Sequence, residues 1–143
     1  GKGKNMGLFD KFKKPVVAIA TPDDLDVMGA IEAHIRWKVR LESYISGEGG
    51  EELDPDVVGK DDQCALGKWI YGPGGAKYDS LPVFQSLKET HRGFHQCAAQ
   101  VIQCVDEGDV DKAGEILTRG CYAKYSNKVK AELARLSIEL GSE

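Results

Sequence analysis

Residues 80–108 carry the sequence pattern that most restricts the fold. Apolar residues and one histidine recur there at alternating spacings of three and four: Phe84, Leu87, His91, Phe94, Ala98, Val101 and Val105. This spacing places all of them on one face of an α-helix, whereas a half-buried strand alternates at every second residue. We therefore expect a helix that begins at Ser80 and Pro82, ends at Gly108 and buries this face.

Two other segments have helical periodicity. The first runs from about Asp23 to Ser46, after a capping sequence at residues 21–24, with Leu25, Met28, Ile31, Ile35, Leu41 and Ile45 as its apolar positions. The second follows Asp109 as a single long helix through Val110, Ala113, Leu117, Cys121, Val129, Leu133, Leu136 and Leu140. His34 lies on or beside the apolar face of the first helix.

The segment between the first two helices contains Cys64. Glycines at 47–50 end the first helix, residues 51–60 are predicted as a loop, residues 63–70 as a short helix and residues 71–75 as a turn. Cys64 falls in the first turn of the short helix. Backbone amides and the helix dipole stabilise a thiolate there, but the preceding acidic pair opposes it, so a stable thiolate needs a metal.

These elements predict an all-α protein. Short connections favour an antiparallel bundle of three long helices plus a short helix that carries the cysteine. We expect residues 22–143 to form this domain and residues 1–21 to be a flexible tail. Met6 is interpreted as the native start. Residues 8–14 mix apolar and basic side chains, and contact of this tail with a membrane is the less favoured alternative to a free basic tail.

Composition narrows the function classes. The 143 residues carry a net charge of −4, which argues against a general nucleic-acid binder. We find no signal peptide, so a cytoplasmic protein with reduced thiols is favoured over one with disulfides. Apart from Cys64, the cysteines Cys97, Cys104 and Cys121 are interpreted as small core or boundary residues, with disulfide pairing as the alternative.

The three histidines point to a metal site. His91 and His95 are one helical turn apart, so both imidazoles can reach a common point. His34 and Cys64 would complete the four-ligand tetrahedral set that zinc prefers. A His-x3-His pair also occurs by chance, and spacing alone leaves ordinary core histidines as an equal alternative.

Three blocks in order resemble one known family. They are His34-Ile35-Arg36-Trp37-Lys38, Cys64-Ala65-Leu66-Gly67-Lys68-Trp69-Ile70-Tyr71-Gly72 and His91-Arg92-Gly93-Phe94-His95. Together they resemble the bacterial chemoreceptor zinc-binding (CZB) domain over roughly residues 25–140. The resemblance implies a helical bundle with a three-His, one-Cys zinc site, formed here by His34, Cys64, His91 and His95.

The resemblance also implies a sensory function. Members of the family are regulatory modules of chemoreceptors or diguanylate cyclases, in which zinc occupancy or oxidation of the zinc-bound cysteine, for example by hypochlorous acid, alters output. Bundles of this family often dimerise, so a homodimer is expected. The apparent start at Met6 favours a free-standing member that acts on a chemotaxis or cyclic-di-GMP partner.

Three other interpretations of the same residues compete with this one. A zinc hydrolase would need an open coordination position and a general base, but the residues between His91 and His95 include no glutamate. A di-iron carboxylate site would need a Glu-x-x-His motif, which the third helix lacks. A purely structural zinc site is the third alternative, and it predicts a Cys64 that resists oxidants.

Overall fold

The computed structural model describes residues 25–141, with side chains described through residue 139. The described part of the chain contains helices and no strand, which confirms the predicted all-α class. In chain order the helices are α2 (Val27–Ser46), α3 (Pro55–Val58), α4 (Ala65–Ile70), α5 (Pro73–Tyr78), α6 (Pro82–Asp106), α7 (Val110–Thr118) and α8 (Cys121–Gly141). The predicted tail, residues 1–21, and the predicted capping sequence, residues 21–24, lie outside the described residues.

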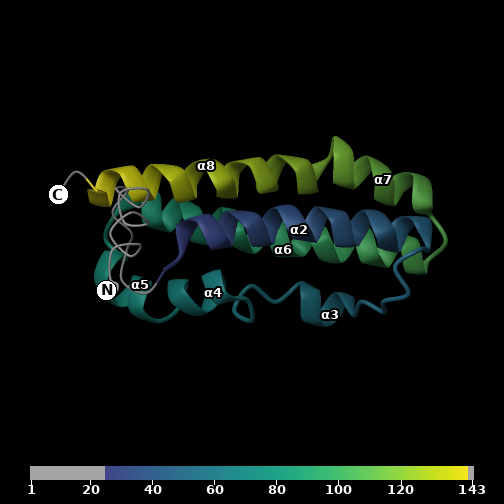
Figure 1. The fold of residues 1–143 in the computed structure, drawn as a ribbon, viewed down its shortest axis with the longest axis horizontal. Coiled ribbons are helices and arrows are strands. Elements are labelled where there is room, and N and C mark those ends of the chain that lie inside the picture. The colour runs from purple at the N-terminus through teal and green to yellow at the C-terminus, as the bar shows by residue number, and fades with distance from the viewer. Residues whose placement is uncertain (1–24, 142–143) are drawn as a thin grey trace, which may run out of the picture.

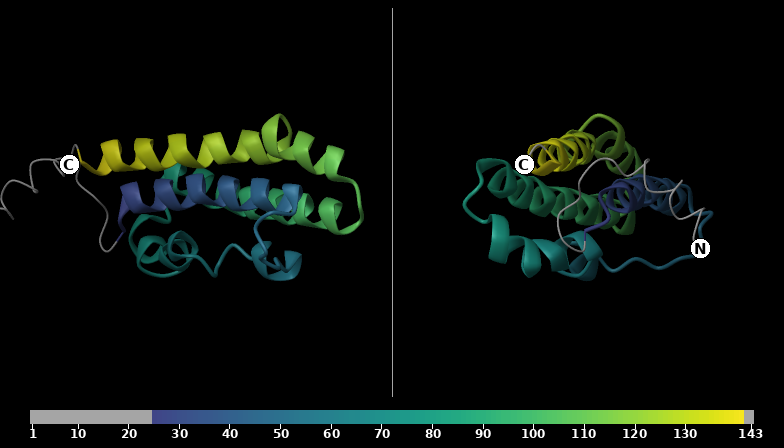
Figure 2. Two further views of the ribbon diagram at one scale, coloured as in Figure 1. Left: turned by 45° about the vertical axis from the view of Figure 1, so that its right-hand side comes forward. Right: turned by 60° about the vertical axis from the view of Figure 1, so that its left-hand side comes forward.

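The long helices lie side by side along the molecule (Figure 1). Helices α2 and α6 run in the same direction, because the segment with α3, α4 and α5 returns along one side of the bundle before α6 begins. Helices α7 and α8 then run back the opposite way, and the two rotated views show the same arrangement (Figure 2). The bundle therefore consists of three long rows of helix, with a layer of short helices on one side.

Helix α6 is the centre of the core. The predicted apolar face is confirmed, since all of its members are buried except the half-buried Val105: Phe84, Leu87, His91, Phe94, Ala98 and Val101. Helix α6 contacts α2, α3, α7 and α8, so its side chains are removed from water on several sides. Gly108, with φ of 88°, follows the helix as predicted.

Helix α2 is turned relative to the prediction. Its buried row is Val27, His34 and Leu41, whereas the predicted positions Met28 and Ile35 are 61% and 51% exposed. The two rows each repeat every seven residues and differ by one position, which is a rotation of about 100° around the helix axis. Asp26 is the N-cap and accepts a hydrogen bond from the amide of Gly29 at 2.9 Å. The prediction for Met28 and Ile35 was wrong, but the inward position of His34 is correct.

Two short helices occupy segments predicted to be irregular. The loop prediction for residues 51–60 was wrong at α3, where Asp54 caps the helix and Pro55 stands at its first position. The turn prediction for residues 71–75 was wrong at α5, which also begins with a proline. Gly74 allows this second helix to lie against Trp69, since a Cβ there would come within 2.6 Å of the indole ring.

The predicted final helix is broken into α7 and α8. The amides of Arg119 and Gly120 both donate to the carbonyl of Glu115, which closes α7 before α8 begins at Cys121. A side chain at Gly120 would lie 2.8 Å from the Cα of Ile116, so glycine permits this tight turn. Apolar periodicity continues through the break, which is why the sequence pattern did not reveal it.

The cysteines correct a further expectation. Cys97 and Cys121 form a disulfide between α6 and α8, whereas we expected unpaired core or boundary residues in a protein with reduced thiols. The helix pairing brings their Cα atoms to 5.9 Å, within the range that disulfides span, although they are 24 positions apart in the sequence. Cys104 is buried and free, as expected, and Cys64 is free and half-buried.

No helix within the described residues has the length and apolar character needed to span a membrane.

Candidate metal centre

His91 and His95 extend from the buried face of α6 toward the same point. Their exposed fractions are 0% and 4%, and their Nε2 atoms are 3.1 Å apart. This is the arrangement expected of residues one helical turn apart. Because the helix is enclosed by the core, the position of both imidazoles is set by the packing of the whole bundle.

Cys64 completes a group of three donor atoms. Its Sγ lies 3.3 Å from Nε2 of His91 and 3.6 Å from Nε2 of His95. Cys64 is the N-cap of α4, and its sulfur accepts a hydrogen bond from the amide of Gly67 at 3.4 Å. One ligand atom from each of these three residues lies within 4.8 Å of the others, so they can hold a metal ion together.

His34 lies next to this group without belonging to it. Its ring centroid is 5.7 Å from that of His91 and 4.6 Å from that of Phe94, and it is buried. With Cys64 and His95 it lines a pocket of about 320 Å³. The structure therefore places all four predicted ligand residues in one region, and it brings the donor atoms of three of them together.

Backbone carbonyls orient two of the histidines. Nδ1 of His95 lies 2.8 Å from the carbonyl oxygen of Val58, and Nδ1 of His34 lies 2.6 Å from that of Ala30. When Nδ1–H donates to a carbonyl, the lone pair is on Nε2, which is the arrangement of a metal-binding imidazole. Nδ1 of His91 is buried and has no hydrogen-bond partner among the described residues.

Burial keeps the imidazoles neutral. Removal from water lowers the pKa of His34 to about 4, with the hydrogen bond to Ala30 opposing the shift. Removal from water, and secondarily the neighbouring His95 and His34, lowers the pKa of His91 to about 2. Burial also lowers the pKa of His95, against its hydrogen bond to Val58. Neutral imidazoles have lone pairs available near pH 7, which favours metal binding over a cluster of positive charges.

The Cys64 thiol needs a cation to ionise. Burial raises its pKa, and the hydrogen bond from the Gly67 amide compensates only in part, while Asp61 raises the pKa further. The predicted opposition between backbone amides and an acidic residue is therefore present for Asp61, with desolvation as the larger effect. A metal ion would reverse this balance, because a coordinating thiol is deprotonated.

The dimensions of the group suit zinc. Zn–N bonds of about 2.0–2.1 Å and Zn–S bonds of about 2.3 Å in a tetrahedron separate two nitrogens by about 3.4 Å, and nitrogen from sulfur by about 3.6 Å. The three separations here are 3.1, 3.3 and 3.6 Å. Imidazole nitrogen and thiolate sulfur are also the donors that zinc prefers, so the residues present fit this metal.

Two pockets include Cys64 in their lining. One is the pocket of about 320 Å³ lined by His34, and the other, of about 390 Å³, includes Leu53, Asp54 and Lys60; both include Cys64, His95 and Trp37. Trp37 thus lines both pockets, and the guanidinium of Arg40 lies 4.0 Å from its ring centroid. The half-buried Cys64 therefore lies at the edge of both pockets.

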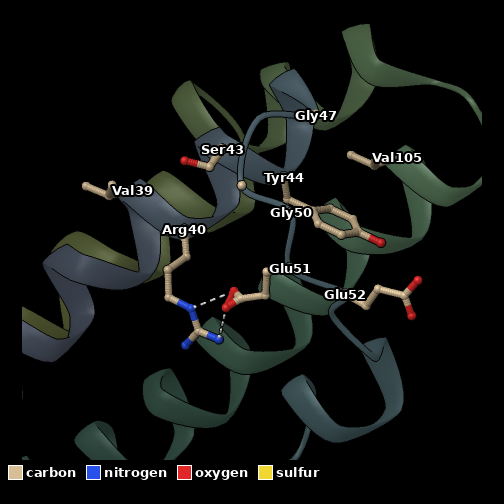
Figure 3. A pocket seen from close by; sticks show the side chains of 10 residues that line it. Val39, Arg40, Ser43, Tyr44, Gly47, Gly50, Glu51, Glu52 and Val105 are labelled. Atoms are coloured by element: carbon tan, nitrogen blue, oxygen red, sulfur yellow. Dashed lines mark hydrogen bonds and ion pairs between the residues drawn. The ribbon is translucent and has the colours of Figure 1, made fainter.

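A larger pocket lies elsewhere. It measures about 550 Å³ and is formed where the end of α2 meets the following glycine-rich loop and α6 (Figure 3). An ion pair of 3.1 Å between Arg40 and Glu51 crosses it. None of the four predicted ligands lines this pocket, so it is separate from the metal centre.

The comparison with protein families agrees with this geometry. The family model described as "Chemoreceptor zinc-binding domain" (CZB) matches residues 34–102, a segment that begins at His34 and includes all four predicted ligands. This segment belongs to the CZB family. No curated protein and no solved structure matched the chain in the other two comparisons.

The CZB assignment establishes the general role of the domain. It is a zinc-binding sensory domain, its metal is zinc, and Cys64, His91 and His95 form a group that can hold that ion. The family is regulatory and is not a known enzyme family.

Sequence reasoning missed the groups that position the ligands. The carbonyl of Val58 leaves no trace in a sequence, since any residue supplies a carbonyl. Gly67 did have a signal, because it belongs to the Cys-Ala-Leu-Gly block of the CZB resemblance. A Cβ at Gly67 would lie 1.8 Å from the carbonyl oxygen of Asp61, so only glycine lets the chain pass there and donate its amide to Cys64.

Proposed function

We propose that this domain senses zinc or oxidants through a site formed by His34, Cys64, His91 and His95, and passes the signal to a chemotaxis or cyclic-di-GMP partner. The observation that carries the proposal is the half-buried thiol of Cys64 beside two neutral, buried imidazoles, with Cys64 lining two pockets. Buried imidazoles would retain the metal, and the accessible sulfur would respond to the signal.

His34 is the proposed fourth ligand. Its Nδ1 is occupied by the carbonyl of Ala30, which leaves Nε2 for a metal, and its ring borders both His91 and the pocket beside Cys64. Its low pKa, caused by burial, keeps that nitrogen unprotonated near neutral pH. Because His34 belongs to α2, zinc would link this helix to α4 and α6.

The proposed oxidant chemistry takes place at the sulfur. When bound, zinc supplies the positive charge that stabilises the Cys64 thiolate. Hypochlorous acid then transfers its chlorine to the thiolate sulfur and releases hydroxide, and water displaces chloride from that sulfur to give a sulfenic acid and a proton. The sulfur loses two electrons and the chlorine gains them. The product is a poorer ligand, which would release the link between α4 and α6.

Release of Cys64 would act on a short helix at the side of the bundle. Helix α4 has six residues, contacts the equally short α5 and packs Trp69 against Phe84 of α6, with ring centroids 5.7 Å apart. This segment can shift while α6 stays enclosed in the core, and the shift would change the surface offered to a partner.

A second copy of the chain is the proposed nearest partner. CZB domains are found in chemoreceptors and dimerise within the family. On α2, Met28, Ile35 and Val39 are 61%, 51% and 57% exposed and follow one another on the outward side of the helix. We expect Ile35→Glu to shift a dimer toward the monomer in sedimentation measurements, whereas Glu32→Lys on the same helix should not.

Signalling partners of this kind act in the cytoplasm, and we propose the same location for this domain. Reducing conditions there would expose the Cys97–Cys121 bond to cellular thiols.

Separate titrations test the function. Purified protein should contain one zinc ion per chain, and hypochlorous acid should release it from the wild type and from the control Cys104→Ser, which changes a buried free cysteine outside the group. Cys64→Ser should bind zinc more weakly and should not respond to the oxidant. Absence of zinc from the wild type would refute the metal site, and oxidant-driven release from Cys64→Ser would refute the role of the sulfur.

The same measurements separate the alternatives. A structural zinc site predicts retention of zinc at oxidant concentrations that modify other thiols. A hydrolase predicts turnover of ester or phosphoester substrates by the zinc-loaded protein. A di-iron site predicts a coloured protein, whereas a zinc protein is colourless.

A further inference from the structure

The Cys97–Cys121 disulfide joins two elements next to the metal centre. Cys97 lies on α6, two residues after His95, and Cys121 is the first residue of α8, directly after the break at Gly120. The bond therefore fixes the start of α8 to the part of α6 that carries the histidines. Cys64 takes no part in it.

A layer of aromatic rings connects this bond to the imidazoles. Tyr122, the neighbour of Cys121, packs on Phe94 with ring centroids 5.0 Å apart. Phe94 in turn lies 4.6 Å from His34 and 5.4 Å from His95. Tyr122 is 1% exposed and its hydroxyl has no hydrogen-bond partner among the described residues, so packing alone holds the ring. Its position depends on where α8 begins.

We propose that Cys97 and Cys121 form a second redox site, closed by two-electron oxidants such as peroxides and opened by thiol or phosphine reductants, and that the closed state strengthens zinc binding. The proposal goes beyond the function proposed above. Formation of the bond needs no zinc, whereas its effect on affinity rests on the zinc site. The consequence is that the domain has two sulfur sites with opposite effects: oxidation of Cys64 weakens the metal centre, and oxidation of this pair strengthens it.

Exposure assigns an order to the reaction. Cys121 is half-buried and Cys97 is 4% exposed, so Cys121 meets the oxidant first. Its sulfur attacks one oxygen of hydrogen peroxide, the O–O bond breaks, and a sulfenic acid and one water form. The Cys97 thiol then attacks that sulfur, the S–S bond forms, and the second water leaves. The two thiols lose two electrons and two protons, and one peroxide becomes two waters.

Reduction reverses the bond without affecting zinc directly. A phosphine takes up one oxygen from water as it reduces the disulfide, so one phosphine oxide and two thiols form. Opening a loop of 24 positions returns conformational freedom to the unfolded chain. We expect reduction to lower the Tm by roughly 5–15 °C.

Peptide mapping tests the pairing. Trypsin cleaves after Arg92 and Lys112 and after Arg119 and Lys124, so Cys97 lies in peptide 93–112 and Cys121 in peptide 120–124. Without reductant, mass spectrometry of the peroxide-treated, zinc-free protein should detect these two peptides linked. Peptide 93–112 also contains Cys104, which makes Cys104→Ser the matched control. The link should persist in Cys104→Ser and in Cys64→Ser and disappear in Cys97→Ser and Cys121→Ser.

Two mapping results would overturn the proposed redox site. One is a link that disappears in Cys104→Ser, which would assign the bond to that cysteine. The other is two unlinked peptides after peroxide treatment of folded, zinc-free protein. Neither depends on whether the protein binds zinc.

Zinc affinity tests the coupling. We expect the zinc Kd of the wild type to rise about fivefold or more when a phosphine reduces the bond, a typical size for coupling between two sites. Cys121→Ser should have the reduced-state Kd under both conditions, and Cys104→Ser should behave as the wild type. An equal Kd for the oxidised and reduced wild type would overturn the coupling. A wild type that binds no zinc in either state would refute the proposed function, while the peptide map would still decide the redox site.

Discussion

The two sides of the metal centre are built on different kinds of structure. His91 and His95 belong to a helix of 25 residues that is enclosed by α2, α3, α7 and α8, and both side chains are almost fully buried. Cys64 caps a helix of six residues and is half-buried between two pockets. The comparison teaches that a metal site can have a fixed side and a responsive side. The histidines owe their positions to the core, and the thiol owes its position to a short local turn.

The largest expected effect is on the histidine side. His91→Ala should weaken zinc binding by more than about 100-fold, because even the groups that merely orient ligands are worth 10–100-fold. Gln96→Ala, an exposed position on the same helix, is the matched control and should bind zinc as the wild type does. Competition with a zinc chelator gives the Kd, and circular dichroism checks the helix content. Similar affinities for the two variants would remove His91 from the ligand set.

The position of the Cys64 thiol can be disturbed by substituting Gly67, which is not a predicted metal ligand. A Cβ in Gly67→Ala would lie 1.8 Å from the carbonyl oxygen of Asp61 and 3.0 Å from the Cα of Asp62, so the backbone has to move. The Gly67 amide that donates to Cys64 moves with it. We expect a loss of about 2–3 kcal/mol in the free energy of unfolding and a zinc Kd weakened by about 10–100-fold.

A glycine elsewhere provides the control for this variant. Gly114 lies inside α7, and a Cβ added there would meet no atom within 4 Å, so Gly114→Ala should stabilise the protein by up to about 1 kcal/mol and leave zinc affinity unchanged. Urea unfolding with and without zinc measures both variants. If Gly67→Ala were as stable as Gly114→Ala, the turn before α4 would not be the constraint that places Cys64.

The same contrast explains how much the sequence could predict. Periodicity identified α6 and its buried face because a long helix with core on several sides has a strong repeat. Periodicity wrongly predicted that Met28 and Ile35 are buried. Helix α2 buries one narrow row of side chains, and the row one residue further along fits the apolar pattern of the sequence equally well. The exposure of Met28 and Ile35, 61% and 51%, depends on what α2 packs against.

The unpredicted features all depend on tertiary contacts. Helices α3 and α5 are shorter than the window that periodicity needs, and they are stable because they pack on other parts of the bundle. The Cys97–Cys121 bond joins residues 24 positions apart and requires the pairing of α6 with α8. By contrast, the inward positions of His91 and His95 follow from local spacing, and the sequence therefore predicted them correctly.

The free energy of unfolding should depend on pH because the histidines are buried, whereas solvent-exposed histidines would have little effect on it. In the zinc-free protein, burial lowers the pKa of His34 from 6.5 to about 4 and that of His91 to about 2. The unfolded chain takes up protons below pH 6.5 and the folded chain does not, so the free energy of unfolding falls as the pH falls. Between pH 6.5 and 5.5 the loss should be about 1 kcal/mol per histidine.

Urea unfolding at several pH values measures this loss. His34→Gln should reduce the loss by about 1 kcal/mol, because one buried proton-binding group is gone. Excess zinc should raise the free energy of unfolding wherever the metal stays bound, since only the folded state offers the complete site. It should not reduce the loss on acidification, because the bound ligands stay deprotonated while the unfolded chain takes up protons. A wild-type stability that is constant from pH 7.5 to 5.5 would show that the imidazoles are hydrated.

The smallest expected effect is that of a substitution in α3, the short helix whose last carbonyl orients His95. Asp54 caps this four-residue helix by accepting from the amide of Asp56 at 2.9 Å, and the last residue of the helix, Val58, orients His95 through its carbonyl. Asp54→Ala should cost about 1 kcal/mol in the free energy of unfolding. It should weaken zinc binding by less than about tenfold, since the carbonyl becomes more mobile but is not removed.

Asp109→Ala is the comparison variant for this last prediction. Asp109 caps α7 in the same way, with its carboxylate accepting from the amide of Lys112 at 3.1 Å, and no metal ligand lies on that helix. It should lose similar stability at full zinc affinity. Equal zinc affinities for Asp54→Ala and Asp109→Ala would mean that α6 alone positions His95. The two histidines of α6 would then need no support from α3 or from the rest of the segment that contains Cys64.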